Sequence, residues 1–316
     1  MFNKKVQSQK ETGHVLFPEM KTSPIIAITR KTLIYNVCTP QKLLVTIILM
    51  IIPPIFTLII WDPRYLSSQT RLTDTMGIVT FLISFGMIFP LIIGITAAPL
   101  IADELRSKTM ISLVSKPISR EGIFAGKFLA LFIYGALSSL ISLIIIAIAA
   151  AIKNPFPDIL EFFSVNFVYS LLVLFTFGGI TMGFSALFSR PRNVFLIPIL
   201  LVLFSFMIGI FIKMLLIFPV FGDEPLYEIF GIYHFDISYH LANVFVMLTE
   251  TYIPNIYDYW YILFMIFGLS RPNYGGGSVI RTNYYPPQVS LIYLLVISSI
   301  LIIVGILYFK RRDISS

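Results

Sequence analysis

Six long segments of the sequence consist almost entirely of apolar residues, and this feature restricts the fold more than any other. A helix needs about 20 apolar residues to cross the roughly 30 Å hydrocarbon layer of a bilayer, and each segment is long enough. None of them alternates apolar and polar residues, as the strands of a membrane β-barrel do. We therefore predict an all-α, polytopic membrane protein with six transmembrane helices. The segments are Lys42–Trp61, Thr75–Ala102, Phe128–Ile152, Ser164–Phe188, Val194–Pro219 and Val289–Phe309.

The composition excludes a soluble domain of this length. Hydrophobic residues make up 57% of the chain and charged residues 12%, and a soluble fold has too little interior to bury that much apolar surface. The net charge of +7 is compatible with nucleic-acid binding, but the basic residues flank the apolar segments in short clusters, as in membrane proteins. We expect contact with membrane lipid and no nucleic-acid partner. Cys38 is the only cysteine, which excludes an internal disulfide.

Basic residues are distributed unevenly between the two sets of loops. The richer set includes the N-terminus, residues 103–127, the Arg190–Arg192 turn and the C-terminal Lys310–Arg312. Because basic residues accumulate on the cytoplasmic side of membrane proteins, we predict a multi-pass protein of the cell membrane with cytoplasmic N- and C-termini. The first forty residues lack the apolar core of a cleavable signal, so the N-terminus is expected to stay attached. The poorer set holds Arg64, Arg71, Lys153, Arg271 and Arg281.

The cytoplasmic N-terminus, residues 1–41, is expected to contain an amphipathic helix that lies in the membrane interface. Ser23 precedes Pro24, which is the usual arrangement of an N-cap followed by proline at the first helical position. Arg30 falls near the apolar face and would have to extend its charge toward water. The expected apolar face consists of Ile26, Leu33 and Val37, and the opposite face of Lys31 and Tyr35.

Residues 220–288 form one long external region before the last transmembrane helix. We expect a helix near Ile237–Thr249 and a flexible turn at Gly275–Gly277. The apolar segment Tyr259–Phe267 is too short to cross the bilayer, so we interpret it as an interfacial or re-entrant helix. A further crossing there would also place the basic C-terminus outside the cell.

The sequence has few polar residues that could form a metal-binding or catalytic site. His234, Asp236 and His240 lie in the external region, but a structural metal site normally requires four converging ligands, and we expect no metal. No arrangement of residues typical of a catalytic site is present, so we expect no catalytic residues and no enzyme activity. Lys213 is the one basic residue well inside an apolar segment, and we expect its charge to reach the external interface.

The loop after the second apolar segment, residues 103–127, carries the most informative pattern. By charge alone it reads as an ordinary solvated loop with positive-inside residues. Pro117 must interrupt any helix there, and Ser119 can cap the helix that follows. The order of its residues, however, resembles the cytoplasmic loop of the type-2 ATP-binding-cassette (ABC) exporter permeases, although Lys108 stands where that family usually has glycine. The matching residues are Glu104, Thr109, Leu113, Pro117, Ser119, Arg120, Gly126 and Lys127.

The resemblance implies a single transmembrane permease domain over residues 1–316, which works as two permease copies with a separate cytoplasmic ABC ATPase. The segment Gly122–Phe128 does not have the spacing of a Walker A phosphate-binding loop. ATP and Mg are therefore expected on the partner, and no cofactor on this chain. The resemblance also implies that the loop couples the two proteins. The expected coupling residues are Glu104, Arg106, Thr109, Leu113, Val114, Pro117 and Arg120.

The substrate path is harder to place. Pro90, Gly94 and Thr96 weaken the second apolar helix and offer polar groups, which suits either a substrate path or a packed kink. The small residues of Gly178–Gly183 favour close helix packing. Two other functions remain open: an ABC-coupled module that acts on an external partner without transport, and an ion-coupled secondary carrier. The carrier would need ionisable residues near the midplane, where this sequence has almost none.

Overall fold

The computed structural model describes residues 23–60, 77, 79–110, 118–152, 159–217, 225–251, 253, 264–272 and 279–312. Within these residues, five helices are long and apolar enough to cross a membrane, or six if the bent pair Pro24–Val37 and Pro40–Phe56 counts as one crossing. The all-α, polytopic fold is confirmed, and the count of six crossings stays a prediction. The five helical stretches are Val79–Arg106, Arg120–Ala151, Ile159–Leu187, Pro191–Ile217 and Pro287–Arg311.

Three of these stretches are single helices and two are composite. The single helices are α7 (Arg120–Ala151), α8 (Ile159–Leu187) and α14 (Pro287–Arg311). One composite stretch joins the π-helix η2 (Val79–Ile88) to α4 (Phe89–Ala97) and α5 (Pro99–Arg106). The other joins α9 (Pro191–Val202), the π-helix η3 (Leu203–Met207) and α10 (Ile208–Ile217).

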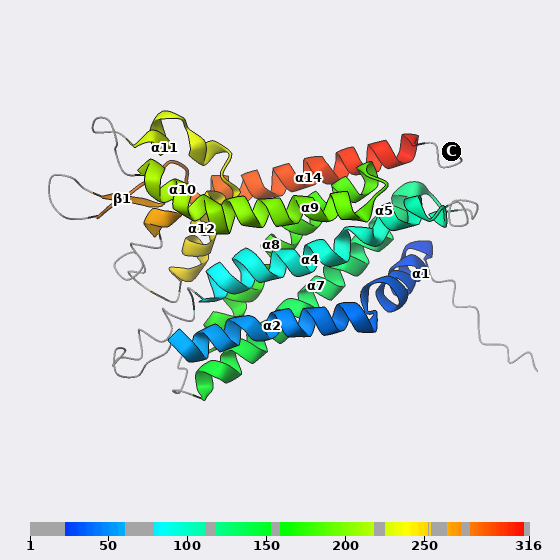
Figure 1. Cartoon of the computed structure of the whole chain (residues 1–316), viewed down its shortest axis with the longest axis horizontal. Helices are drawn as coiled ribbons and strands as arrows, with labels where there is room; N and C mark the ends of the chain where they lie inside the picture. Colours follow the sequence, from blue (N-terminus) through cyan, green and yellow to red (C-terminus); the bar gives the residue numbers. More distant parts are fainter. Residues whose placement is uncertain are drawn as a thin grey trace, which may run out of the picture.

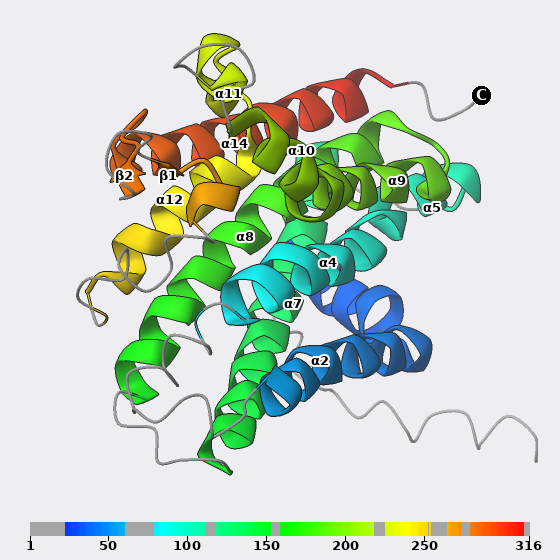
Figure 2. The ribbon, with the colours of Figure 1, turned by 60° about the vertical axis from the view of Figure 1, so that its left-hand side comes forward.

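Helix α8 runs through the middle of the bundle, where it contacts α4, α5, α7, α9 and α14 (Figure 2). Its contact with α14 is close because neither helix has a side chain at the crossing point. A Cβ on Gly183 would lie 2.5 Å from the carbonyl oxygen of Leu301, and one on Gly305 would lie 2.8 Å from Cα of Gly183. The packing role predicted for Gly178–Gly183 is therefore confirmed for Gly183.

The N-terminal segment forms helix α1 (Pro24–Lys31), continues as the π-helical turn η1 (Thr32–Val37), and then bends by 72° into α2 (Pro40–Ile60). Ser23 is the N-cap residue and Pro24 the first helical residue, as predicted, although the Ser23 side chain makes no capping hydrogen bond. The bend suits a helix that lies along the interface, which stays a prediction.

The predicted faces of this segment are wrong at Ile26, which lines one groove with Lys31 and Tyr35 instead of lying opposite them. The Ile26 side chain is 56% exposed, whereas Ile28, Thr29, Thr32 and Val37 are buried, on a segment that packs against α7. The prediction assumed 3.6 residues per turn throughout. The π-helical turn has a wider period, so it shifts the face that the later residues present.

The region predicted to be external, for which we keep the name external region, is a small body of short elements at one end of the bundle. It contains α11 (Leu226–Ile229), η4 (Ile232–His234) and α12 (Ile237–Thr249), and the last of these confirms the predicted helix. One antiparallel hairpin, β1 (Ser270–Pro272) with β2 (Val279–Arg281), was not predicted. The Gly275–Gly277 turn and most of Tyr259–Phe267 lie outside the described residues.

Aromatic rings join the external body to the bundle. The ring of Phe245 on α12 lies 4.7 Å from that of Phe81 on η2 and 5.0 Å from that of Tyr169 on α8, measured between centroids. All three side chains are buried. The external body therefore sits on the core of the bundle and is not a separate domain.

The described ends of the chain lie together at the opposite end of the bundle (Figure 1). The Arg120 guanidinium at the start of α7 donates to the carbonyl oxygens of Phe309 at 3.1 Å and Arg312 at 2.5 Å. The Thr29 hydroxyl of α1 donates to the carbonyl oxygen of Gly126 at 3.1 Å. This arrangement suits the predicted orientation, with both termini on one side of the membrane.

Candidate coupling site

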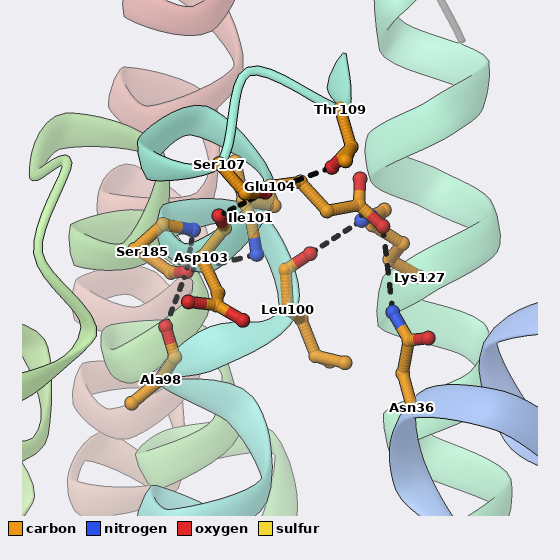
Figure 3. A network of polar contacts seen from close by, with 11 residues as sticks. Asn36, Ala98, Leu100, Ile101, Asp103, Glu104, Ser107, Thr109, Lys127 and Ser185 are labelled. Carbon is orange, nitrogen blue, oxygen red and sulfur yellow. Dashed lines mark hydrogen bonds and ion pairs between the residues drawn. The ribbon is translucent and has the colours of Figure 1, made fainter. Parts of the chain in front are cut away.

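The boundary between α4 and α5 brings the predicted coupling loop to the end of the bundle. Pro99 has no N–H and starts a new helix, so the regular hydrogen bonding of the preceding helix is interrupted. The Ser185 hydroxyl of α8 binds the backbone groups at this break (Figure 3). Its oxygen accepts hydrogen bonds from the backbone N–H groups of Ile101 at 3.2 Å and Ala102 at 3.1 Å. The hydroxyl also donates to the Ala98 carbonyl oxygen at 2.9 Å. Ser185 thus fixes α5 to the central helix.

A buried ion pair joins α5 to α7. The Lys127 ammonium lies 2.5 Å from a carboxylate oxygen of Glu104, and the two side chains are 1% and 17% exposed. Lys127 also donates to the carbonyl oxygen of Leu100 (Figure 3). Because a charge in such a place is costly unless it is paired and hydrogen-bonded, Lys127 depends on these two groups. The ion pair therefore links the two ends of the loop, and with them the helices α5 and α7.

The N-terminal segment joins the same ion pair. The Asn36 amide of η1 donates to the other carboxylate oxygen of Glu104 at 3.4 Å, and Lys42 of α2 donates to the Asn36 carbonyl oxygen at 2.6 Å. Gly126, next to Lys127, lets α1 approach α7, since a Cβ there would lie 2.9 Å from the Ile28 side chain. Glu104 thus connects three parts of the chain that are distant in sequence.

Helix α5 ends in a cap at Lys108, the position where the sequence departs from the family pattern. The backbone N–H of Ser107 donates to the Asp103 carbonyl at 2.8 Å, and the Ser107 and Thr109 hydroxyls lie 3.0 Å apart. Lys108 follows with φ of 58°, the left-handed conformation that glycine usually supplies after a helix. The backbone therefore keeps the shape that a glycine would favour, and Lys108 adopts it at a cost.

The other predicted coupling residues have different surroundings. Arg106 and Thr109 are exposed at the end of α5. Leu113, Val114 and Pro117 lie outside the described residues. Ser119 caps α7 as predicted, because its hydroxyl accepts from the backbone N–H of Gly122 at 3.1 Å. Arg120 binds the end of α14, as described above.

Lys127, which matches the family pattern of the loop, is not available to acidic residues of a partner protein. The Lys127 side chain is buried, and its ammonium forms an ion pair with Glu104. Glu104 likewise faces into this chain, with a basic partner of its own. The sequence showed the order of these residues but not that Gly126-Lys127 turns inward under α1.

The residues predicted for a substrate path lie in packed surroundings. Pro90, Gly94 and Thr96 are all buried. A Cβ on Gly94 would lie 2.5 Å from the Pro198 side chain, so this position allows α4 to approach α9. The Thr96 hydroxyl donates to the Ile92 carbonyl within its own helix. These contacts favour the packed kink, and a substrate path at these residues stays a prediction.

A second buried ion pair lies at the external end, and it corrects the expectation for Lys213. The Lys213 ammonium does not extend to solvent: it lies 2.5 Å from Asp236, and the two side chains are 7% and 6% exposed. Asp236 also caps α12, accepting from the Ser238 N–H at 3.0 Å and from the Tyr227 hydroxyl at 2.9 Å. Burial opposes the charge of Asp236, but Lys213 and these donors together hold its pKa below the ordinary value.

The two external histidines also have partners within the chain. His234 lies 2.5 Å from the Tyr285 hydroxyl, and His240 lies 3.0 Å from the Ser290 hydroxyl and stacks on Tyr293. The Asp236 carboxylate forms an ion pair with Lys213. In the part of the chain that the structure describes, no three His, Cys, Asp or Glu residues are grouped as a metal site would require.

Comparison with known proteins agrees with the pattern of the loop. The family model described as "ABC-2 family transporter protein" matches residues 8–314, which is nearly the whole chain. A comparison with curated proteins finds no match.

Proposed function

Because this chain belongs to the ABC-2 family of transporter proteins, we propose that it is the permease subunit of an ATP-driven exporter. Two copies span the membrane and each binds a cytoplasmic ATPase, which holds ATP and Mg. The chain itself performs no catalysis. Its role is to turn movement of the ATPase into movement of the transmembrane helices.

The observation that carries this proposal is the linkage at the ends of the loop. Glu104 lies near the start of the loop and Lys127 at its end, and their ion pair holds α5 against α7. Through Asn36 the same carboxylate contacts the N-terminal segment. A force on the loop therefore acts on three helical segments at once, which is what a rigid-body transition requires.

Two apolar residues in the sequence of the loop supply the expected contact with the ATPase. Leu113 and Val114 are apolar residues within a basic loop, and interfaces draw most of their binding energy from such anchors. The basic residues Arg106 and Lys108 are exposed at its start and suit an acidic rim on the ATPase.

The test is co-purification of the cognate ATPase with Leu113→Asp. We expect the variant to lose the ATPase, since a charge in an apolar contact costs on the order of 2 kcal/mol or more at a hot spot. Phe235→Asp is the matched control, because Phe235 is 83% exposed in the external body, and it should retain the ATPase. If Leu113→Asp retains the ATPase at the level of the control, the loop is a solvated connector and the proposal fails.

A membrane module that acts on an external partner without transport remains the second function. The external body favours it only weakly, because it is small and joined to the bundle core at Phe245. ATP-dependent flux of candidate substrates into inside-out vesicles distinguishes the two: ATP turnover without any flux supports the module.

A further inference from the structure

The outward face of α1 and η1 carries a stripe of mixed apolar and basic residues beside a groove of about 390 Å³. All of its side chains are exposed, on the side away from the buried Ile28 and Thr32. We call this surface the outer stripe. It consists of Ile26, Ala27, Arg30, Lys31, Ile34 and Tyr35.

The π-helical turn explains why these residues align. The residues of the outer stripe recur every four positions, as in Ile26, Arg30 and Ile34. In a regular α-helix each interval of four residues turns the side chain by about 40° around the helix axis. In η1 the backbone N–H of Cys38 donates to the carbonyl oxygen of Leu33 at 2.8 Å, five residues earlier. Such a bond accommodates an extra residue per turn. Ile34 and Tyr35 therefore continue the line of Arg30 and Lys31 instead of turning toward α7.

The charges of the outer stripe are not neutralised within the described chain. Arg30 and Lys31 form no ion pair with any residue that the structure describes. An arginine fork and a neighbouring ammonium together bind a phosphate group well. Two adjacent exposed cations that the described residues leave unpaired can therefore hold an anion.

The apolar members of the stripe indicate what kind of molecule carries that anion. Ile26 and Ile34 are 56% and 51% exposed, and Tyr35 is 70% exposed. Tyrosine favours the level of lipid headgroups, and exposed isoleucines favour hydrocarbon. The next helix, α2, lies at 72° to this segment and exposes Leu44 and Ile48 by more than half. The bend allows one lipid to place its anionic headgroup on the α1–η1 segment and its acyl chains beside α2.

We propose that the outer stripe binds an anionic phospholipid of the cytoplasmic leaflet. Arg30 and Lys31 hold its phosphate group, Tyr35 lies at the glycerol level, and Ile26 and Ile34 contact the acyl chains. The opposite face of the same segment contacts Gly126, and Asn36 contacts Glu104. The bound lipid therefore supports the coupling site. The inference relies on the proposed function only for the cytoplasmic position of α1.

The experiment measures thermal unfolding of the purified full chain in detergent, with added phosphatidylglycerol or phosphatidylcholine of identical acyl chains. Phosphatidylglycerol should raise the unfolding temperature, and phosphatidylcholine and inorganic phosphate should not. The R30Q/K31Q double variant should require at least tenfold more phosphatidylglycerol for the same shift. The R190Q/R192Q double variant is the matched control: it removes two exposed basic residues at the same end of the bundle, and it should respond as the wild type does.

Three results would overturn the proposal. Equal shifts with the two lipids, or an equal response of the wild type and R30Q/K31Q, would show that the stripe does not select anionic lipid. Loss of the ATPase from R30Q/K31Q in lipid-free detergent would assign the stripe to the ATPase instead. If the double variant does not fold, the single variants R30Q and K31Q replace it, and each should show part of the loss. No ATPase is needed for the titration, so its failure leaves the proposed function untouched.

Discussion

The two ends of the bundle each bury a lysine–carboxylate pair, and the two carboxylates differ in how many other groups they bind. Asp236 at the external end accepts from Lys213, Tyr227 and Ser238 and is 6% exposed. Glu104 at the other end forms an ion pair with Lys127 and accepts a hydrogen bond from Asn36 at 3.4 Å, and it is 17% exposed. The external pair belongs to a fully bonded network, whereas the pair beside the loop is held by few groups.

The number of bonding partners indicates which of the two ion pairs holds its end of the bundle rigid. Asp236 begins α12 and cannot turn away without losing the cap of that helix. Glu104 can turn toward water if Lys127 moves, because its side chain is already partly exposed. Fully satisfied polar networks rigidify a structure, and partly satisfied ones do so less. We infer that the external pair stabilises the fold and that the pair at the loop transmits movement.

The largest effect is expected from Lys213→Met. It leaves Asp236 buried without its counter-charge, which costs about 3–5 kcal/mol when one partner of a buried pair is removed. Chemical or thermal unfolding in detergent measures the loss, and the double variant K213M/D236N should recover part of it. Wild-type stability of Lys213→Met would mean that the pair is not formed.

The same substitution at the other pair, Lys127→Met, should cost less stability. Glu104 can turn to water, so we expect a loss of about 1–2 kcal/mol. The two variants make the same substitution, and each removes the lysine of a buried pair from a carboxylate in different surroundings. If they lose equal stability, the contrast between the two ends is wrong.

Lys108→Gly should stabilise the end of α5. Lysine in the left-handed conformation costs on the order of 1 kcal/mol relative to glycine, and part of that should be recovered. The same unfolding assay gives the gain. A loss of stability would show that Lys108 makes a contact that offsets its backbone conformation.

The smallest expected effect is a loosening of the external body in acid. Burial lowers the pKa of His240 below its ordinary value, although the His234 carbonyl partly opposes this. The unfolded chain then binds the proton more readily, so this stability is complete above about pH 6.5 and is lost as the pH falls below it. Hydrogen exchange in α12, corrected for intrinsic rates, should rise between pH 7.5 and 5.5. His240→Gln should abolish that rise, and α7 should not show it.

Local patterns in the sequence predicted much of the fold. The length of the apolar segments predicted the membrane helices, and Ser119 and Pro24 predicted where two helices begin. These features depend only on residues close together in the chain. The glycines of α8 also indicated close packing, although the sequence did not show that Gly305 of α14 faces Gly183.

The polar contacts of the site could not be predicted in the same way. Lys213 and Asp236 belong to different elements, and the sequence shows only an isolated lysine in an apolar segment. Ser185 gave no signal beyond being a hydroxyl in an apolar helix, and its partners lie more than 80 residues earlier. The face of α1 was wrong because a single π-helical turn changes the register, and no residue in Thr32–Val37 marks that turn.

The central claim is that movement of the loop reaches the helices through the Glu104–Lys127 pair. The most direct measurement places a fluorophore on Phe235→Cys in a Cys38→Ser background and follows its signal when ATP is added to the complex with the ATPase. The signal should change on ATP addition in this background. With Lys127→Met added, the ATPase should remain bound, while the ATP-dependent change should fall to a tenth or less. A change of full size in the Lys127→Met protein would contradict the account.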